Sequence, residues 1–184
     1  MKALKSRPQE WSIRLILPSV PHDGTSYTDD FALDLASAVL YYGQEYRLTR
    51  PLSVHVEAVR SAERIILSIS LEAEIETACA RCLEPAKTQT SSTLHWIFST
   101  TREDEEQRDE WKYDEVVLLD SWEEHIELGD YVWETFVTTL PVSVLCKADC
   151  RGLCPNCGAN LNKQTCNCHD AQGDPRFAVL KNLL

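Results

Sequence analysis

The amino-acid sequence predicts an α+β protein in which an antiparallel β-sheet packs against helices and a cysteine-rich module follows. Three observations support this fold class. Apolar and polar residues alternate with a period of two from residue 52 to residue 77, and apolar residues recur at helical spacing in residues 131–140. The cysteines gather mainly in the C-terminal part of the chain. We therefore expect a sheet-and-helix domain over residues 1–145 and a module over residues 146–184.

The composition narrows the class of protein. The chain has 184 residues, of which 43% are hydrophobic and 26% charged, as in ordinary globular domains. Its 18 basic and 29 acidic residues give a net charge of −11. Such a charge argues against coating nucleic acid by electrostatics alone and favours a basic partner.

The hydropathy of the chain indicates no membrane segment. No apolar stretch approaches the roughly 18 residues needed for a membrane span. The N-terminal residues include basic side chains but no apolar run of signal-peptide length. We therefore expect a cytoplasmic protein with no membrane partner.

The sheet is expected to form from several segments. Trp11–Leu17 alternates in the manner of a strand, and residues 52–77 predict a long antiparallel hairpin with one buried face. A third strand follows Pro85, and Tyr113–Leu119 is a candidate short strand. Residues 31–42 are apolar but show no clear period, so no element is assigned to them.

Two helices are expected to pack with this sheet. Tyr131–Leu140 carries its apolar residues on one helical face, Asp130 is placed to cap its start, and Pro141 marks its end. A short helix is expected after Pro175.

The eight cysteines are arranged in four closely spaced pairs. Zinc favours four thiolates in a tetrahedron, and a C-x2-C turn supplies two of them. A glycine after such a turn, as at Gly158, lets the chain fold back so that amide groups face the sulfur atoms. The pairs are Cys79/Cys82, Cys146/Cys150, Cys154/Cys157 and Cys166/Cys168.

Eight thiolates suit two four-coordinate sites, divided by proximity in sequence. The last two pairs would form a local site, in which His169 is an alternative ligand to a cysteine. The first two pairs would form a second site that pins the sheet to the C-terminal module. We therefore expect structural zinc, one or two ions, and a zinc-stapled C-terminal module.

Other uses of the cysteines stay open. Disulfides need an oxidising compartment, and a thioredoxin-like role for Cys79/Cys82 needs a helix N-terminus that the sequence does not provide there. An iron–sulfur cluster also suits four thiolates. The five histidines are scattered, and no Gly-rich phosphate loop or H-E-x-x-H motif is present. We therefore expect no catalytic residues and no enzyme activity.

An acidic segment is a candidate surface for a protein partner. Between Arg102 and Glu127, twelve carboxylates face only three basic residues, with aromatic side chains interleaved. Acidic surfaces raise the association rate of basic partners, and aromatic residues often anchor interfaces. The plainer interpretation is a solvated loop. The candidate partner-binding residues are Glu103, Asp104, Glu105, Glu106, Trp111 and Trp122.

Five blocks in order resemble a known family. They are Cys79-Ala-Arg-Cys-Leu-Glu-Pro85, Leu140-Pro141, Cys150-Arg-Gly-Leu-Cys-Pro-Asn-Cys-Gly-Ala-Asn-Leu-Asn162, Cys166-x-Cys168 and Asp174-Pro-Arg-Phe-Ala-Val-Leu180. Over roughly residues 45–184, this order is similar to that of the YceD family, which is named for large ribosomal RNA subunit accumulation.

The resemblance implies a non-catalytic factor for assembly of the large ribosomal subunit that supports accumulation of its 23S ribosomal RNA. The implied partners are a precursor of the large subunit, its 23S RNA, a small basic ribosomal protein, or a combination of these, with no small-molecule substrate. Two alternatives stay open: a thiol redox or metal enzyme acting through Cys79/Cys82, and a zinc-ribbon protein that binds nucleic acid.

Overall fold

The chain forms two compact units. The computed structural model describes residues 6–61, 64–100, 115–122 and 124–168. The sheet unit comprises Met1–Thr77 and Lys87–Val142, and the cysteine-rich unit comprises Ala78–Ala86 and Ser143–Leu184. The chain thus enters the cysteine-rich unit twice. The predicted division at residues 1–145 and 146–184 stays a prediction.

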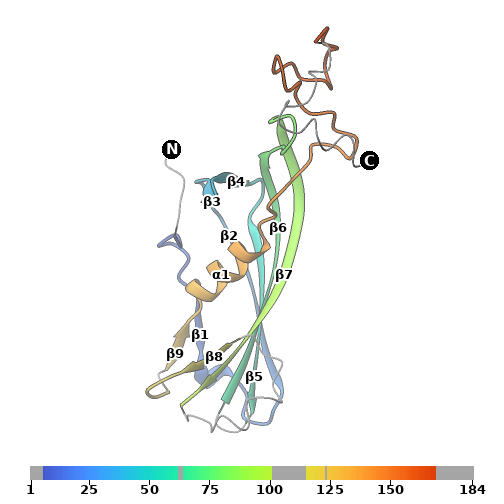
Figure 1. The fold of residues 1–184 in the computed structure, drawn as a ribbon. Helices are drawn as coiled ribbons and strands as arrows, with labels where there is room; N and C mark the ends of the chain where they lie inside the picture. Colours follow the sequence, from blue (N-terminus) through green and yellow to red (C-terminus); the bar gives the residue numbers. More distant parts are fainter. Residues whose placement is uncertain (1–5, 62–63, 101–114, 123, 169–184) are drawn as a thin grey trace, which may run out of the picture. The chain divides into compact units, whose positions relative to one another are not determined.

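The sheet unit contains a seven-stranded sheet and a separate pair of short strands in the described residues (Figure 1). In the large sheet the order is β2-β5-β6-β4-β3, and β7 pairs with both β6 and β8. In the small sheet β1 pairs with β9 in antiparallel fashion. The strands are β1 Arg14–Ile16, β2 Ser26–Leu33, β3 Val39–Tyr41, β4 Gln44–Leu48, β5 Leu52–Ser61, β6 Arg64–Ala78, β7 Pro85–Ser99, β8 Glu115–Leu118 and β9 His125–Glu127.

The predicted long hairpin is confirmed. Strands β5 and β6 pair antiparallel from Ser61 opposite Arg64 to Ser53 opposite Glu72. The alternating apolar residues of both strands are buried, which leaves the polar set on the other face. The third predicted strand is also present as β7. Its side chains bond those of β6 at Ser68–His95 and at Ser70–Thr93, both at 2.8 Å.

One predicted strand needs correction in its bounds, and the expected antiparallel pairing needs correction at another strand. Trp11–Leu17 forms a strand only at Arg14–Ile16, because Pro18 starts a 3-10 helix over Leu17–Ser19. The predicted alternation still holds in the burial of this segment. The short strand expected over Tyr113–Leu119 is confirmed as β8, Glu115–Leu118, but it pairs with β7 in parallel, with Phe98 opposite Val117. The sheet is therefore mostly, but not wholly, antiparallel.

Four further strands were not expected from the sequence pattern, namely β2, β3, β4 and β9. Strand β2 lies within and before the apolar stretch of residues 31–42, and β3 lies at the end of that stretch. In the described residues β2 pairs only with β5, so its alternate side chains are half-buried rather than buried. Such an edge position tolerates polar residues, and the apolar period is weak for that reason.

One α-helix is present in the described residues, whereas we expected two. It is α1, Gly129–Thr139, and it ends before Pro141 as predicted. Asp130 does not cap it, because the N-cap residue is Leu128 and makes no side-chain cap. Asp130 instead forms an ion pair with Arg7 at 2.8 Å. The helix expected after Pro175 lies outside the described residues.

Helix α1 packs on the apolar face of the sheet (Figure 1). Phe136 meets Trp11 at a ring-centroid distance of 5.8 Å, and Tyr131 meets Trp96 of β7 at 5.2 Å. Edge-to-face geometry of this kind stabilises buried aromatic pairs. The core of the sheet unit is thus formed by the hairpin, β7, α1 and the N-terminal segment.

Candidate metal centres

The first cysteine pair lies in the turn between the two longest strands. Strand β6 ends at Ala78 and β7 begins at Pro85. The amide of Leu83 donates to the carbonyl of Cys79 at 3.0 Å, and the amide of Cys79 donates to the carbonyl of Glu84 at 2.8 Å. These bonds fold the segment into a tight turn, in which Leu83 has a positive φ of 61°. Both sulfur atoms therefore come from one short, well-fixed loop.

This loop meets the first C-terminal pair to form the deep cluster, Cys79, Cys82, Cys146 and Cys150. Its four sulfur atoms all lie within 4.8 Å of one another. The Cys79 and Cys150 sulfur atoms are 3.8 Å apart, and those of Cys82 and Cys146 are 3.5 Å apart. A zinc ion with four thiolates at about 2.3 Å holds sulfur atoms about 3.8 Å apart. The geometry therefore fits a tetrahedral metal ion.

The deep cluster is largely shielded from solvent. Cys79, Cys82 and Cys150 are buried, while Cys146 is exposed. They share a small apolar core with Ala86 and Val144. The amide of Ala80 donates to the carbonyl of Val144 at 2.8 Å, which fixes one segment of the unit on the other.

The remaining cysteines form the shallow cluster, Cys154, Cys157, Cys166 and Cys168. Its four sulfur atoms also lie within 4.8 Å of one another. Cys154 is buried, Cys166 is half-buried, and Cys157 and Cys168 are exposed. The amide of Gly158 donates to the carbonyl of Cys154 at 2.9 Å, and Gly158 has a φ of 72° that disfavours other residues. The glycine expected to turn the chain does so. In the described residues these two clusters are the only groups with metal-binding geometry.

In both clusters some thiols have a lowered pKa and others a raised one, and the largest shifts are at Cys79 and Cys146 in the deep cluster and at Cys154 and Cys168 in the shallow one. Burial raises the pKa of Cys79, but donation from the Arg81 amide and neighbouring amides outweighs it and gives about 6. Donation from the Cys157 and Asn156 amides lowers the pKa of Cys154 to about 6.

The raised pKa values arise first from hydrogen bonds with neighbouring cysteine side chains. Hydrogen bonding with Cys82, and then burial, raises the pKa of Cys146 to about 12. Hydrogen bonding with Cys157, and then burial, does the same for Cys168. Four adjacent thiolates would repel one another, so the thiols do not all lose their protons unless a cation binds between them.

The proposed partner surface is described only in part. Glu103, Asp104, Glu105, Glu106 and Trp111 lie outside the described residues, as does His169. Trp122 is half-buried and packs against the core of the sheet unit. This position agrees with the plainer interpretation for that one aromatic residue.

Sequence reasoning did not single out Asn162, which contacts the deep cluster. Its side-chain amide donates to the Cys150 sulfur at 3.4 Å. The residue appeared only as part of a longer family block. A signal was available, because an amide side chain inside a cysteine loop is well placed to donate to a thiolate.

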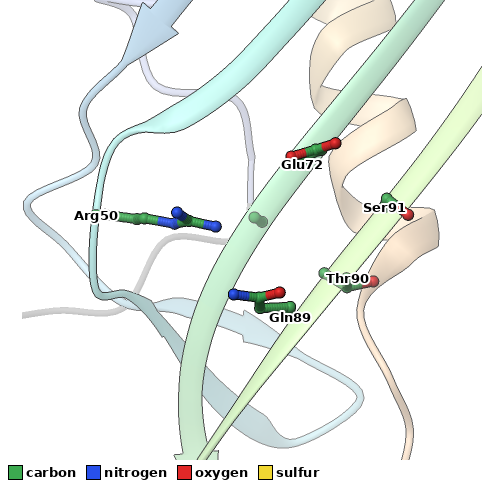
Figure 2. Close-up of a pocket in the computed structure, with 6 residues that line it drawn as sticks. Arg50, Glu72, Gln89, Thr90 and Ser91 are labelled. Atoms are coloured by element: carbon green, nitrogen blue, oxygen red, sulfur yellow. The ribbon is translucent and has the colours of Figure 1, made fainter.

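A pocket in the sheet unit has fewer side chains that could bind a metal ion or catalyse a reaction. It has a volume of about 220 Å³, and Arg50 extends into it from the loop between β4 and β5 (Figure 2). Its other lining residues are Glu72, Ala73, Gln89, Thr90 and Ser91. It holds no cysteine or histidine and no adjacent pair of carboxylates, so the clusters are the stronger candidate site.

Comparison with known proteins identifies the family. The model of the family described as "Large ribosomal RNA subunit accumulation protein YceD" matches residues 67–184. This chain belongs to the YceD family. The resemblance found in the sequence is thereby confirmed, and the match includes all eight cysteines.

Curated relatives extend the comparison. An uncharacterized protein of Mycobacterium tuberculosis is 33% identical over 141 residues, which cover 72% of this chain and 61% of that protein. A protein of Arabidopsis thaliana named "Large ribosomal RNA subunit accumulation protein YCED homolog 1, chloroplastic" is 22% identical, over 76% of this chain and 50% of that protein. The homologue of the same name in Zea mays is 24% identical, over 71% and 54%. The chain thus spans about half to three fifths of the relatives' lengths.

No solved structure matches the fold significantly. Within the described residues, no helix has the length and hydropathy needed to cross a membrane.

Proposed function

We propose that this chain is a non-catalytic factor for assembly of the large ribosomal subunit that supports accumulation of its ribosomal RNA. Membership of the YceD family supports this function, as do the printed names of the two plant relatives. The observation that carries the non-catalytic part is the pair of four-cysteine clusters. A metal ion with four thiolate ligands has no open coordination position for a substrate or an attacking water.

We propose that both clusters hold zinc as a structural ion. Cys79, Cys82, Cys146 and Cys150 would hold one ion, and Cys154, Cys157, Cys166 and Cys168 the other. Bound zinc would cross-link segments that have little apolar surface to bury. Elemental analysis of protein purified under reducing conditions without chelators should find close to two zinc ions per chain. Iron with inorganic sulfide would instead support an iron–sulfur protein.

A thiol redox enzyme acting through Cys79/Cys82 fits the geometry less well. The pKa of Cys79, about 6, would suit a reactive thiol. However, Cys79 is fully buried, and its sulfur lies 3.8 Å from that of Cys150. Reactive cysteines are partly exposed so that a substrate disulfide can reach them. We also propose a cytoplasmic location, where the reducing environment keeps such cysteines as thiols.

The proposed partners are a precursor of the large subunit, its 23S RNA, and a small basic ribosomal protein. The net charge of −11 favours the protein contact, with the acidic residues 103–106 as the proposed surface. A zinc-ribbon protein that binds RNA directly should instead lose affinity steeply as salt rises.

Sucrose-gradient fractionation tests the function directly. A tagged copy of the protein, expressed in the organism it comes from, should migrate with large-subunit precursors. Deletion of its gene should lower the amount of large-subunit RNA relative to small-subunit RNA. A variant lacking both Cys79 and Cys82 serves as the comparison for the role of the deep cluster. The proposal would be contradicted if the protein stayed at the top of the gradient, apart from ribosomal particles, and if deletion left the ratio of large-subunit to small-subunit RNA unchanged.

A further inference from the structure

We infer that the two cysteine clusters are linked, and that Asn162 is the residue through which the shallow cluster strengthens metal binding at the deep one. This inference rests on the proposal that both clusters bind metal. It adds a positioning residue that is not itself a ligand.

The orientation of the Asn162 side chain is fixed by its neighbours. Its Oδ1 accepts a hydrogen bond from the backbone amide of Arg151 at 2.9 Å. A backbone amide can only donate, so the carbonyl end must face Arg151 and the NH₂ end must face the other way. There Nδ2 donates to the Cys150 sulfur at 3.4 Å and to Oδ1 of Asn160 at 3.0 Å. The side chain therefore presents a donor to a deep-cluster thiolate.

Asn162 nevertheless belongs to the loop that the shallow cluster closes. It lies between the second and third ligands of that cluster, Cys157 and Cys166. The loop is held by backbone bonds from Cys154 to Ala159 at 2.8 Å and from Leu161 to Gly152 at 2.9 Å. A metal ion on the shallow ligands would fix both ends of this loop.

A second contact ties the same loop to the first cysteine turn. Glu84, two residues after Cys82, accepts from Lys163 Nζ at 2.6 Å and from Asn160 Nδ2 at 3.3 Å. The Lys163 ammonium and the Glu84 carboxylate form an ion pair at this contact. The loop of one cluster is thus bound to the ligand turn of the other.

The short linker between the clusters is also fixed. Leu153 donates its amide to the carbonyl of Arg81 at 3.1 Å, and Arg81 Nη1 donates to the carbonyl of Cys150 at 2.9 Å. Gly152 has a φ of 75°, and a Cβ there would lie 3.2 Å from the Arg81 carbonyl oxygen. The linker has little freedom to absorb a movement of either cluster.

These contacts predict a measurable coupling between metal binding at the two clusters. Metal at the shallow cluster orders the loop, and the ordered loop holds the Asn162 donor against Cys150. A hydrogen bond to a coordinating thiolate stabilises it, and loss of such an outer partner typically costs 10- to 100-fold in metal affinity. By reciprocity, metal at the deep cluster should strengthen binding at the shallow one by the same factor.

Competitive zinc titration of the full chain against a chromophoric chelator tests this link. Asn162→Ala should weaken the deep cluster roughly 10-fold. Asn162→Asp keeps the acceptor for Arg151 but loses the donor, so it should weaken the deep cluster while the shallow one still binds. Gln164→Ala, an exposed position in the same loop, is the matched control and should change neither affinity.

The decisive comparison repeats Asn162→Ala in a chain whose shallow cluster is disabled by Cys157→Ser and Cys166→Ser. The deep cluster should already be weak there, and Asn162→Ala should add little. Cobalt substitution gives a second readout, because loss of the donor should shift the sulfur-to-cobalt charge-transfer band to longer wavelength.

Two outcomes would overturn the link: an Asn162→Ala chain with unchanged deep-cluster affinity, or an equal loss in both backgrounds. Either result, with two zinc ions still bound by the wild type, would leave the proposed function standing. A wild-type chain that binds no metal would overturn the zinc proposal together with the link.

Discussion

The two units of the molecule are stabilised in different ways. In the described residues, the sheet unit has one large apolar core that runs along the hairpin and under α1. The core of the cysteine-rich unit has five buried residues, and three of them are cysteines. Burial of apolar surface can hold the first unit together. The second unit has too little of it, so the proposed zinc ions would supply much of its stability.

Loss of the deep cluster should show this difference most strongly. In Cys79→Ser, the cysteine-rich unit should lose its protease resistance while the β-sheet signal in circular dichroism persists. Structural zinc in small modules contributes about 10 kcal/mol or more of binding free energy, which is folding free energy there. Limited proteolysis with mass spectrometry would locate the first cleavages.

Two comparisons sharpen that experiment. A chelator applied to the wild type should reproduce the effect, and added zinc should reverse it in the wild type but not in Cys79→Ser. Cys157→Ser should loosen the C-terminal part while leaving the sheet folded. Equal loss of sheet signal and of protease resistance throughout the chain would show that the units are not independent.

A core truncation in the sheet unit should give the opposite pattern. Phe136 is 1% exposed and packs against Trp11, so Phe136→Ala should lower the free energy of unfolding by about 3–5 kcal/mol. The zinc content should not change. Val142→Ala is the matched control, because its side chain is 82% exposed. Urea denaturation and elemental analysis of the same samples measure both quantities, and zinc loss in Phe136→Ala would refute the separation.

A smaller effect is expected at Glu127, which joins β9 to the N-terminal segment. Its carboxylate accepts from Ser12 Oγ and the Ile13 amide, both at 3.1 Å. Burial raises the pKa of Glu127, but these donors, with Gly129 and Arg7, lower it below the usual 4.5. Glu127→Gln should therefore cost about 1 kcal/mol at neutral pH.

The loss of stability in Glu127→Gln should depend on pH, because it arises from the charged form of Glu127. A lowered folded-state pKa means that the charged form contributes stability above about pH 4.5, and that this contribution disappears as pH falls through the folded value. The difference in the free energy of unfolding between wild type and Glu127→Gln should therefore become smaller as the pH falls from 7 into the acid range. Glu124→Gln, at an exposed position, should show no such gap. A gap that stays constant with pH would argue for packing rather than charge.

The smallest effect on stability is expected in the acidic segment. Replacing Glu103, Asp104, Glu105 and Glu106 by their amides should change stability by no more than about 0.5 kcal/mol. Capture of a small basic ribosomal protein should weaken, more at about 50 mM than at about 150 mM salt, since screening strengthens with salt. A pull-down with unchanged binding at both concentrations would favour a solvated loop.

The hairpin and the cysteine clusters could be predicted because their signals are local or chemically strict. Strict alternation in residues 52–77 reflects burial on one face, and thiol spacing reflects the geometry of a metal ion. The parallel pairing of β8 with β7 could not be predicted, since direction depends on a partner distant in sequence. Asp130 was misassigned for a similar reason, because its partner is Arg7.

The contacts around the clusters were also beyond prediction. Asn162 lies 12 residues from Cys150 and Lys163 lies 79 residues from Glu84, and spacing alone does not pair them. Ligand identity follows from residue type, whereas the outer contacts depend on how the loop folds.

The position of Cys79 and Cys82 in the turn between β6 and β7 has a consequence for synthesis. Cys79 and Cys82 lie three residues apart and are made together, whereas Cys146 follows Cys82 by 64 residues. At about 5–20 residues per second, the nascent chain would carry half of the proposed metal site for roughly 3 to 13 seconds. During that interval the two thiols would be open to oxidation or to a metal other than zinc, so under the zinc proposal the time at which zinc arrives would matter as much as the affinity for it.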